Sequence, residues 1–598
     1  MKERVLYLLK VYLATVAIFL LAKIGFILFN GAGHDVGIIE ILSVLRHGMT
    51  LDLSTALYLL VVPFLLTIVV IWTDINRWVL RIYYTIIALA LALTFVADTC
   101  IYRFWGTKLD ASYLQYLEQP EGITQSVSWP YLFMVVIALT GGTIIIFLLF
   151  DKIKKPTENR GSVKRRLAET IVYLLCIPCI VIGVRGGIGE STTNTGQAYF
   201  SQNQFLNHAA VNPLFSFFYS VNHQMEELDS YQFLSEEACS ELTDGVYTTE
   251  SIDNDTLLNT PRPNVLVILM ESAGEQFANA MPRLQHLKKE GVSFSNCYAN
   301  SWRTDRGTVC TLSGYPSFPT LSVMKIQDKS ETLPGIAHSL QEEEYHTTYL
   351  YGGDINFTNM RSYLIATGWE RLISMNNYSI EEQRSSRWGV RDDITFKTLE
   401  ELIKTQEGSA FLIGYSTLSS HEPWDVPIRR LNDKVQNAFA YLDDCLCDFI
   451  DRLRKTPSWH NLLIVITADH GINYQDVTPS TPLRKNHIPM LWVGGAVKEP
   501  RRIETLCNQS DMVATLLGQM RLSHHDFTFS RDICSKTYRH PTAVHNYSRA
   551  QWITDSTGQQ LYDFDTEQAI IDESTDGEAL LRLNKAILQI THQDLKNR

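Results

Sequence analysis

A carboxylate and an imidazole stand side by side where a strongly apolar run of the sequence ends. Residues 462–468 are apolar enough to form a strand buried on both faces, and Asp469, His470 and Gly471 follow directly. Open α/β sheets bind their ligands at the carboxyl ends of such strands. Alone, Asp469 could cap the next helix and His470 could be an ordinary loop histidine. The pair predicts a metal site if neighbouring strand ends supply further ligands.

Other apolar runs place possible ligands at comparable positions. Residues 265–270 end at Glu271, and residues 411–416 lead to His421 within the sequence Ser-Ser-His-Glu-Pro. His487 stands just before a further apolar run. Oxygen and nitrogen ligands of this kind suit Zn²⁺ or Mn²⁺. Together with Asp469 and its neighbouring histidine, these positions favour a divalent metal centre over unrelated loop residues.

The segment after Glu271 offers a nucleophile. Thr304 and Thr308 stand before or within a helix-like turn, where oriented backbone N–H groups favour anions. A hydroxyl bound to a divalent cation becomes accessible as an alkoxide near neutral pH. Arg303 and Arg306 could neutralise a phosphate, or they could be surface arginines beside an ordinary helix cap. These residue types predict metal-assisted phosphoryl chemistry and leave both threonines open as the nucleophile.

Short apolar runs alternate with helical periods from residue 264 onward. The predicted strands cover residues 265–270, 347–351, 411–416, 463–467 and 490–493. Helices are expected between them, over residues 334–344, 393–406 and 433–455. Strands that alternate with helices predict a mainly parallel sheet sandwiched by helices. Near the carboxyl end, residues 551–563 predict a hairpin and residues 577–593 a closing helix.

The first part of the chain is much more apolar than the rest. Five segments are long enough to cross a bilayer, at residues 5–29, 53–72, 79–102, 131–150 and 171–184. The loop after the fourth segment is rich in lysine and arginine, so we expect it in the cytoplasm. Five crossings then place the N-terminus inside and the remaining chain outside. We therefore expect a multi-pass protein of the cell (inner) membrane with an extracytoplasmic, or periplasmic, second domain.

Four regions are expected along the chain. They are a transmembrane domain (1–186), a connector with an amphipathic helix (187–260), an α/β domain (261–545), and a C-terminal hairpin and helix that complete it (546–598). The net charge of −12 argues against a general nucleic-acid binder. The seven cysteines of the outer domain lack the regular spacing of a disulfide framework, and the Cys445-Leu446-Cys447 spacing is wrong for a redox CxxC motif. The oligomeric state stays open.

In their order, these motifs resemble those of the alkaline phosphatase and sulfatase superfamily. They comprise a strand ending in Glu, a Thr where a helix begins, a Ser-Ser-His-x-Pro segment and an Asp-His-Gly after a strand. Five membrane segments followed by an outer domain resemble more narrowly the lipoteichoic acid synthase and phosphoglycerol transferase group, which transfers glycerol phosphate. The resemblance implies a catalytic metal ion held by Glu271, Thr304, Asp469 and His470.

The same resemblance implies further roles. Thr304 matches the nucleophile through its spacing to the Leu-Ser-Gly that follows it, and Thr308 is the second choice. His421 would stabilise the transferring phosphoryl group or protonate the leaving alkoxide. Asp354 would contact the substrate head group. His487 matches a histidine near the metal of related ethanolamine-phosphate transferases, where it could hold a second ion.

Two departures from the family patterns narrow the prediction. Residues 310–314 read Cys-Thr-Leu-Ser-Gly and lack the Pro and Arg of the formylglycine sulfatases, so that chemistry is not expected. Residues 357–360 read Phe-Thr-Asn-Met where the synthase group has Phe-Trp-Asn-Arg, although Arg361 is adjacent. Phosphoryl chemistry is therefore expected, while glycerol phosphate as the head group is left open.

The combined prediction is a membrane-anchored transferase that depends on Mn²⁺ or Zn²⁺. It would move a phosphoglycerol- or phosphoethanolamine-type head group from a membrane phospholipid to a glycan or lipid acceptor, through a phosphothreonine-type intermediate. A hydrolase of phosphoric or sulfuric esters, in which water replaces the acceptor, is the alternative. A non-catalytic membrane sensor with the same fold is a third interpretation, and it predicts no bound metal.

Overall fold

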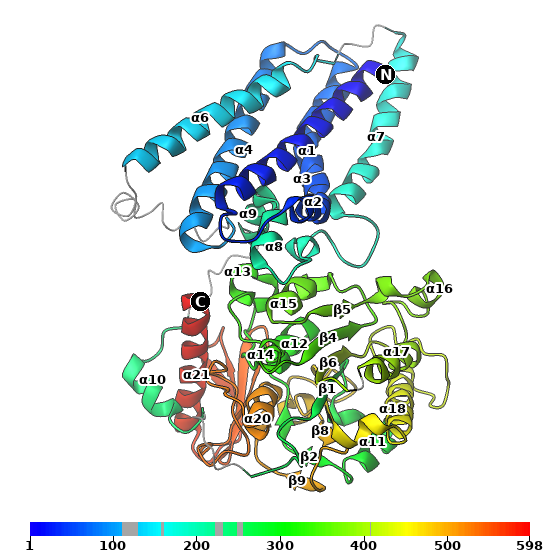
Figure 1. Cartoon of the computed structure of the whole chain (residues 1–598), viewed down its shortest axis with the longest axis vertical. Coiled ribbons are helices and arrows are strands. Elements are labelled where there is room, and N and C mark those ends of the chain that lie inside the picture. Colours follow the sequence, from blue (N-terminus) through cyan, green and yellow to red (C-terminus); the bar gives the residue numbers. More distant parts are fainter. Residues whose placement is uncertain (110–128, 157–160, 222–230, 248–254, 407) are drawn as a thin grey trace. The chain divides into compact units, whose positions relative to one another are not determined.

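The chain forms two structural units. The computed structural model describes residues 1–109, 129–156, 161–221, 231–247, 255–406 and 408–598 (Figure 1). The units comprise Met1–Gln224 and Met225–Arg598. The boundary between them lies inside the region predicted as a connector, so the helices just before it belong to the first unit.

Five long apolar helices dominate the first unit. They are α1 (Lys2–Asn30), α3 (Met49–Val70), α4 (Arg77–Trp105), α6 (Trp129–Asp151) and α7 (Val163–Arg185) (Figure 1). In the described part of the chain, these five helices are long and apolar enough to cross a membrane. The five predicted spans are therefore confirmed as helices. α1, α4, α6 and α7 extend beyond their predicted segments at both ends, whereas α3 begins before residue 53 and ends at Val70. Asn76 caps α4 by accepting the backbone N–H of Trp78 at 3.1 Å.

Three shorter helices complete this unit. They are α2 (Ile38–His47), α8 (Gln204–Ala210) and α9 (Pro213–Val221). The last two occupy the stretch where one amphipathic helix was expected. They are separate because Pro213 begins α9, and the Asn212 side chain accepts the backbone N–H of Leu214 at 3.1 Å. Residues 205–210 of α8 are all buried, so α8 packs inside the first unit.

The second unit is built on an eight-stranded sheet. Its strands, in spatial order, are β5 (Arg371–Ile373), β4 (His346–Tyr351), β6 (Phe411–Ser416), β1 (Asn264–Met270), β7 (Leu462–Ala468), β8 (Met490–Val493), β2 (Val292–Phe294) and β9 (Arg501–Ile503). β1 lies at the centre and runs parallel to both β6 and β7. The five predicted strands are confirmed, and β8 runs antiparallel to β7.

Helices cover both faces of this sheet. One layer contains α11 (Pro282–Leu287), α17 (Asp392–Thr405) and α18 (Lys434–Leu453), and the other contains α12 (Thr304–Ser313), α14 (Ile336–Glu342) and α20 (Met512–Gln519) (Figure 1). Every residue of β6 and β7 is buried between the layers. The apolar runs of the sequence are thus the strands that both layers cover, as expected for a parallel sheet.

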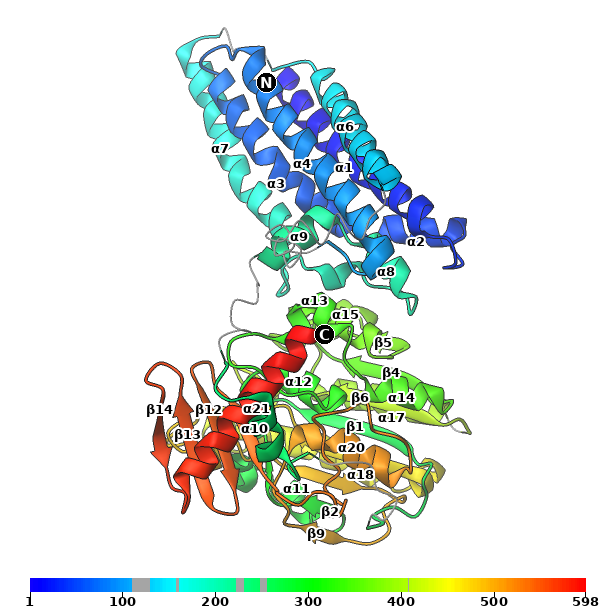
Figure 2. The same cartoon turned by 90° about the vertical axis from the view of Figure 1, so that its left-hand side faces the viewer.

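A second, antiparallel sheet lies beside the first. It contains β11 (Ala543–Asn546), β12 (Ala550–Asp555), β13 (Gly558–Asp563) and β14 (Gln568–Asp572). The predicted hairpin corresponds to β12 and β13, and the closing helix α21 (Gly577–Asn597) packs across both strands (Figure 2). Leu580 and Ile587 of this helix bury against Ile553.

Candidate metal centre and active site

Glu271, Asp469 and His470 converge at the carboxyl ends of β1 and β7. The parallel register sets Met270 opposite Ala468, so the next residue of each strand also lies side by side. Ligand atoms of the three side chains lie within 4.8 Å of one another, and all three residues are buried. His470 Nε2 is 3.7 Å from Glu271 Oε1 and 3.6 Å from Asp469 Oδ2. Two carboxylates and an imidazole at these distances form a donor set that suits a divalent cation.

Backbone N–H groups hold one carboxylate oxygen of Asp469, while the other oxygen faces His470. Oδ1 accepts the backbone N–H of Ser272 at 2.8 Å and that of His470 at 2.7 Å. Oδ2 is buried and has no hydrogen-bond partner among the described residues. An orphaned carboxylate oxygen of this kind is costly unless a cation or proton neutralises it. The arrangement therefore fits a metal ligand better than a helix cap.

The protonation equilibria of the three side chains are perturbed in the way expected of metal ligands. Burial raises the pKa of Asp469 to about 6. Burial, and then the charge of Asp469, raise the pKa of Glu271, against the opposing effects of His470 and His421. Burial lowers the pKa of His470 to about 4, so its imidazole is neutral near pH 7. A divalent cation would relieve the repulsion between the carboxylates and bind the neutral imidazole.

Thr304 completes the group from a third element, α12. Its hydroxyl donates to Glu271 Oε2 at 3.2 Å and lies 3.4 Å from His470 Nε2. α12 can approach the end of β7 because Gly307 has no side chain, and a Cβ there would lie 2.1 Å from the carbonyl oxygen of Asp469. The first turn of a helix also presents free backbone N–H groups, which favour a phosphate. The hydroxyl is thus placed where a metal ion and a phosphoryl group could both reach it.

The second candidate nucleophile, Thr308, lies one turn further along α12. Its side chain is 0% exposed, and its Oγ1 has no hydrogen-bond partner among the described residues. Thr304 is partly exposed. A substrate can reach the hydroxyl of Thr304 from solvent, whereas Thr308 faces the interior of the helix layer. The geometry thus favours Thr304, the first choice of the sequence analysis, over Thr308.

His421 and Asp354 lie on loops that follow β6 and β4. The ring of His421 packs on Trp388, with ring centroids 4.5 Å apart, and its Nδ1 lies 2.8 Å from the carbonyl oxygen of Glu422. Asp354 Oδ1 accepts the backbone and side-chain N–H groups of Asn356, each at 3.0 Å. Both strands end at the same edge of the sheet as β1, so both loops belong to the edge that carries the metal ligands.

Three further residues, Arg303, Arg306 and His487, were predicted to contact the substrate or a second metal ion. The guanidinium of Arg306 is buried and donates to the backbone carbonyls of residues 318–320 at 2.9–3.0 Å. Arg303 is exposed, with its Nε 3.6 Å from Asp305 Oδ1. His487 Nε2 lies 2.9 Å from the backbone carbonyl of Ser295. In the described part of the chain, His487 is not a member of the group formed by Glu271, Asp469 and His470. The roles of Arg303, Arg306 and His487 in substrate binding stay predictions.

Sequence reasoning missed several residues that support the site. Gln509 Nε2 donates to the backbone carbonyls of Gly307 and Asp469 at 3.0 and 2.9 Å, which ties α12 to the end of β7. Lys485 is buried and its ammonium donates to the backbone carbonyl of Gly471. Trp388 packs on His421, as described above. No local motif marks these positions, because each acts through contacts that are remote in sequence.

Comparisons with known proteins agree with this geometry. Residues 263–522 match the model of the sulfatase family. A phosphoglycerol transferase I of Xanthomonas campestris pv. campestris is 22% identical over 283 residues, which are 43% of this chain and 40% of that protein. Lipoteichoic acid synthase 2 of Bacillus subtilis is 21% identical over 449 residues, which are 66% of this chain and 65% of that protein. The chain thus matches less than two thirds of the length of either relative.

Two solved structures share the fold of the second unit. A protein of the alkaline phosphatase superfamily from Vibrio parahaemolyticus has a TM-score of 0.53 and 23% identity, and covers 61% of this chain and 97% of its own. A lipoteichoic acid synthase from Listeria monocytogenes has a TM-score of 0.51 and 15% identity, and covers 60% of this chain and 98% of its own.

The five apolar helices indicate a multi-pass membrane protein. The second unit carries the central sheet, the flanking helices and the sulfatase-family match. This part of the chain is therefore similar to the sulfatase family, and the chain is similar to phosphoglycerol transferases and lipoteichoic acid synthases.

Proposed function

We propose that this protein is a membrane-anchored transferase that moves a phosphoglycerol-type head group from a phospholipid to an acceptor hydroxyl outside the cytoplasm. The observation that carries the proposal is the position of Thr304. Its hydroxyl stands at the first turn of α12, 3.2 Å from Glu271 Oε2 and 3.4 Å from His470 Nε2. We assign residues 1–186 to membrane anchoring, residues 187–260 to a connector, and residues 261–545 with 546–598 to catalysis, and we place the protein in the inner membrane.

Glu271, Thr304, Asp469 and His470 would hold one divalent cation, for which we propose Mn²⁺ or Zn²⁺. When bound, the cation supplies Lewis acidity that lowers the pKa of the Thr304 hydroxyl and screens the charge of the phosphoryl oxygens. The backbone N–H groups at the start of α12 add further stabilisation of that charge.

The reaction then proceeds in two in-line displacements. In the first, the Thr304 alkoxide attacks the phosphorus, the bond from phosphorus to the diacylglycerol oxygen breaks, and His421 protonates that leaving oxygen. The product is a phosphodiester between Thr304 and the head group. In the second, the acceptor hydroxyl gives its proton to His421 and attacks the phosphorus, and the bond to Thr304 Oγ1 breaks, which restores the Thr304 alkoxide. Each step thus leaves His421 in the protonation state that the other step requires.

The loop that follows β4 supports recognition of a small polar head group. Arg361 Nε donates to Asn356 Oδ1 at 2.9 Å, and Asn356 in turn donates to Asp354. Phe357 lies on this loop, and its ring centroid is 6.2 Å from that of Trp388, which comes from the segment before α17. We propose that Trp388 and Arg361 provide the aromatic side chain and the cation that residues 357–360 lack. This composition suits a phosphoglycerol- or phosphoethanolamine-type group, bound through hydroxyl or ammonium contacts to Asp354.

The test uses the full-length protein in vesicles that contain phosphatidylglycerol labelled in its head group. Thr304→Ala should lower turnover by about 10³-fold or more, because no nucleophile remains. Thr308→Ala should retain turnover within about tenfold, since its hydroxyl is buried away from the site. Mass spectrometry of the wild-type protein should detect the phosphodiester on Thr304. Normal turnover by Thr304→Ala would refute the proposal.

The fate of the label identifies the acceptor. Label in a glycan or in a lipid supports transfer and names the acceptor class. Release of the free head group as the sole product, with every acceptor present, would instead establish the hydrolase alternative. Removal of divalent cations with EDTA, followed by separate addition of Mn²⁺ and Zn²⁺, tests the metal assignment in the same vesicles.

A further inference from the structure

The first unit contains a polar pocket of about 640 Å³ where α1 and α4 end and α8 begins. Its polar lining is supplied by Asn30, His34, Arg103, Asn203, Gln204 and His208. Aromatic rings of Phe29, Tyr102 and Phe205 form other parts of its wall. No carboxylate is among the described residues that line it. The lining therefore offers many hydrogen-bond donors and positive charge, without a built-in anion.

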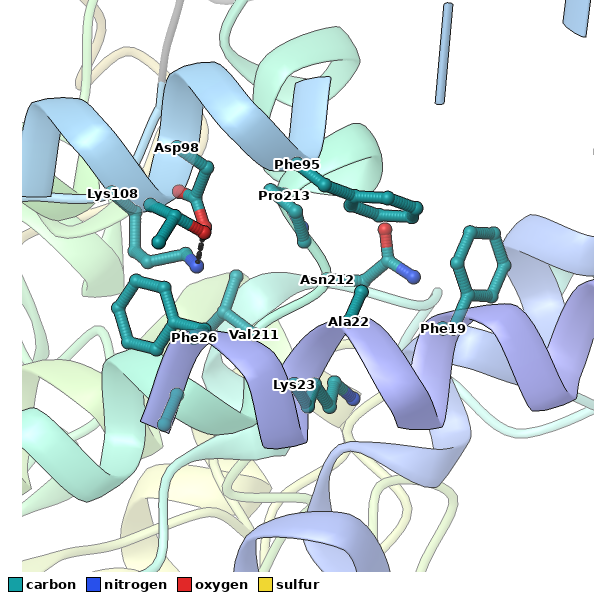
Figure 3. A pocket seen from close by; sticks show the side chains of 12 residues that line it. Phe19, Ala22, Lys23, Phe26, Phe95, Asp98, Lys108, Val211, Asn212 and Pro213 are labelled. Atoms are coloured by element: carbon teal, nitrogen blue, oxygen red, sulfur yellow. Dashed lines mark hydrogen bonds and ion pairs between the residues drawn. The ribbon is translucent and has the colours of Figure 1, made fainter. Parts of the chain in front are cut away.

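Arg103 provides that positive charge. Its guanidinium lies over the ring of Phe29, 5.6 Å from the centroid, and it has no carboxylate partner in the described part of the chain. The two buried lysines nearby are neutralised. Lys23 Nζ donates to Asp52 at 2.7 Å, and Figure 3 shows Lys108 donating to Asp98. Among the described residues that line the pocket, Arg103 is thus the cation without a carboxylate partner.

The neighbouring helix α2 shows at what depth the pocket lies in the membrane. Ile38, Ile39 and Leu42 of α2 are 78%, 75% and 61% exposed. A short helix that exposes large apolar side chains beside the end of a membrane span is typical of an interfacial helix. α2 packs on α8, whose residues line the pocket. Since α1 runs from the cytoplasmic N-terminus, the pocket lies at head-group level in the outer leaflet.

The polar groups of the pocket are held in place by contacts within the unit. Asn203 Nδ2 donates to the backbone carbonyl of His34 at 3.2 Å, and the ring of His34 stacks on Phe205 with centroids 4.3 Å apart. His208 Nδ1 lies 2.9 Å from the hydroxyl of Tyr102. A ligand would therefore order few additional side chains on binding, which favours affinity.

We propose that this pocket binds the head group of an anionic glycerophospholipid of the outer leaflet. A phosphodiester carries one negative charge, which matches the single uncompensated charge of Arg103, and an arginine binds phosphate oxygens through two N–H groups. The imidazole of His34 supplies a donor for a further oxygen, whereas the amide nitrogen of Gln204 is engaged by Tyr199 and His208. The acyl chains would stay in the bilayer beside α1 and α4. The inference extends the proposed function by giving the lipid donor a site within the membrane unit.

Binding can be measured without turnover in the full-length Thr304→Ala protein. Native mass spectrometry in detergent would follow the titration with phosphatidylglycerol, with phosphatidylcholine as the zwitterionic comparison. Arg103→Gln should weaken phosphatidylglycerol binding by about tenfold or more, because one charge-assisted contact is lost. Arg103→Lys should keep part of the affinity. Arg46→Gln removes an exposed cation of α2 that does not line the pocket, and it should bind within about twofold of the parent.

Several outcomes would overturn the proposal. Equal affinity of Arg103→Gln and the parent for phosphatidylglycerol would overturn it. An equal loss of affinity in Arg103→Gln and Arg46→Gln would also overturn it, because that result would indicate an effect of diffuse surface charge. Displacement of the lipid by millimolar inorganic phosphate would assign the pocket to the free anion. Selective lipid binding with no head-group transfer by the wild-type protein would refute the proposed function alone. If the wild-type protein transfers the head group and the Arg103→Gln variant binds the lipid normally, the proposed pocket alone is refuted.

Discussion

Removal of one charge from the candidate metal centre should stabilise the protein without metal and destabilise it with metal. Asp469→Asn keeps the size of the side chain and an oxygen for the backbone N–H groups of Ser272 and His470. Its new amide nitrogen takes the position of Oδ2, 3.6 Å from His470 Nε2, where it can donate to that ring. The substitution therefore changes the charge of the site with little change in packing.

The magnitude follows from the pKa of Asp469, which burial raises from 3.8 to about 6. The native state holds this proton more tightly than the unfolded state, so the stability of the metal-free protein falls as pH rises from about 4 to about 6. At pH 7.5 the full cost is present, about 3 kcal/mol at 1.36 kcal/mol for each pH unit. Asp469→Asn should remove this cost and raise the melting temperature in EDTA by roughly 5 °C.

Metal should reverse the order of the two proteins. At a free concentration of about 1,000 times Kd, a bound ion stabilises the wild-type protein by about 4.1 kcal/mol, which exceeds the cost of about 3 kcal/mol, and the variant should lose most of that gain. Thermal unfolding in detergent, with EDTA or with Mn²⁺ at pH 7.5, measures both effects. Asp443→Asn is the control for the metal effect alone: Asp443 is equally buried but lies outside the group of metal-ligating residues, so Mn²⁺ should stabilise this variant as much as the wild type. A variant less stable than wild type in EDTA would refute the reasoning.

Three further predictions concern the same site. Because protons compete with metal for Asp469, turnover at fixed Mn²⁺ should fall as pH drops below about 6, and the midpoint should move to lower pH when more Mn²⁺ is added; a midpoint independent of Mn²⁺ would contradict this. Gly307→Ala should cost several kcal/mol in thermal unfolding because its Cβ would meet the backbone of Asp469, whereas Gly189→Ala, with nothing within 4 Å, should be neutral. Trp388→Ala should lower kcat/KM by about tenfold with unchanged melting temperature, and Trp388→Phe should recover part of it; equal activity of Trp388→Ala and wild type would exclude Trp388 from the site.

The sequence predicts those strands and helices in which every residue is buried or every residue follows one regular pattern of burial. The strand β7 is buried at every position, and its composition shows this directly. β2, β5 and β9 have three residues each, and β9 exposes two arginines, so no period marks them. The antiparallel direction of β8 was also beyond reach, because a strand's composition does not encode its direction relative to its neighbours.

The site shows the same division. Glu271 and Asp469 could be identified as candidates because each follows a buried strand, where the chain turns out of the sheet. Arg306 was predicted to neutralise a phosphate, but its guanidinium donates hydrogen bonds to three backbone carbonyls. These bonds depend on the position of residues 318–320, which the local sequence does not reveal. Gln509 ties α12 to β7 from a segment with no recognisable motif. Long-range contacts of this kind leave no trace in local spacing.

The central position of β1 has a consequence for how the protein acquires its metal. β1 pairs with β6 and β7, which begin only at Phe411 and Leu462, so Glu271 and Thr304 leave the membrane during export well before Asp469 and His470. The coordination set is thus complete only after nearly the whole second unit has been exported and its sheet has closed. Under the proposed function, the site would take up its cation outside the cytoplasm. The metal content of the surroundings, rather than the buffered cytoplasmic pools, would then decide which ion it carries.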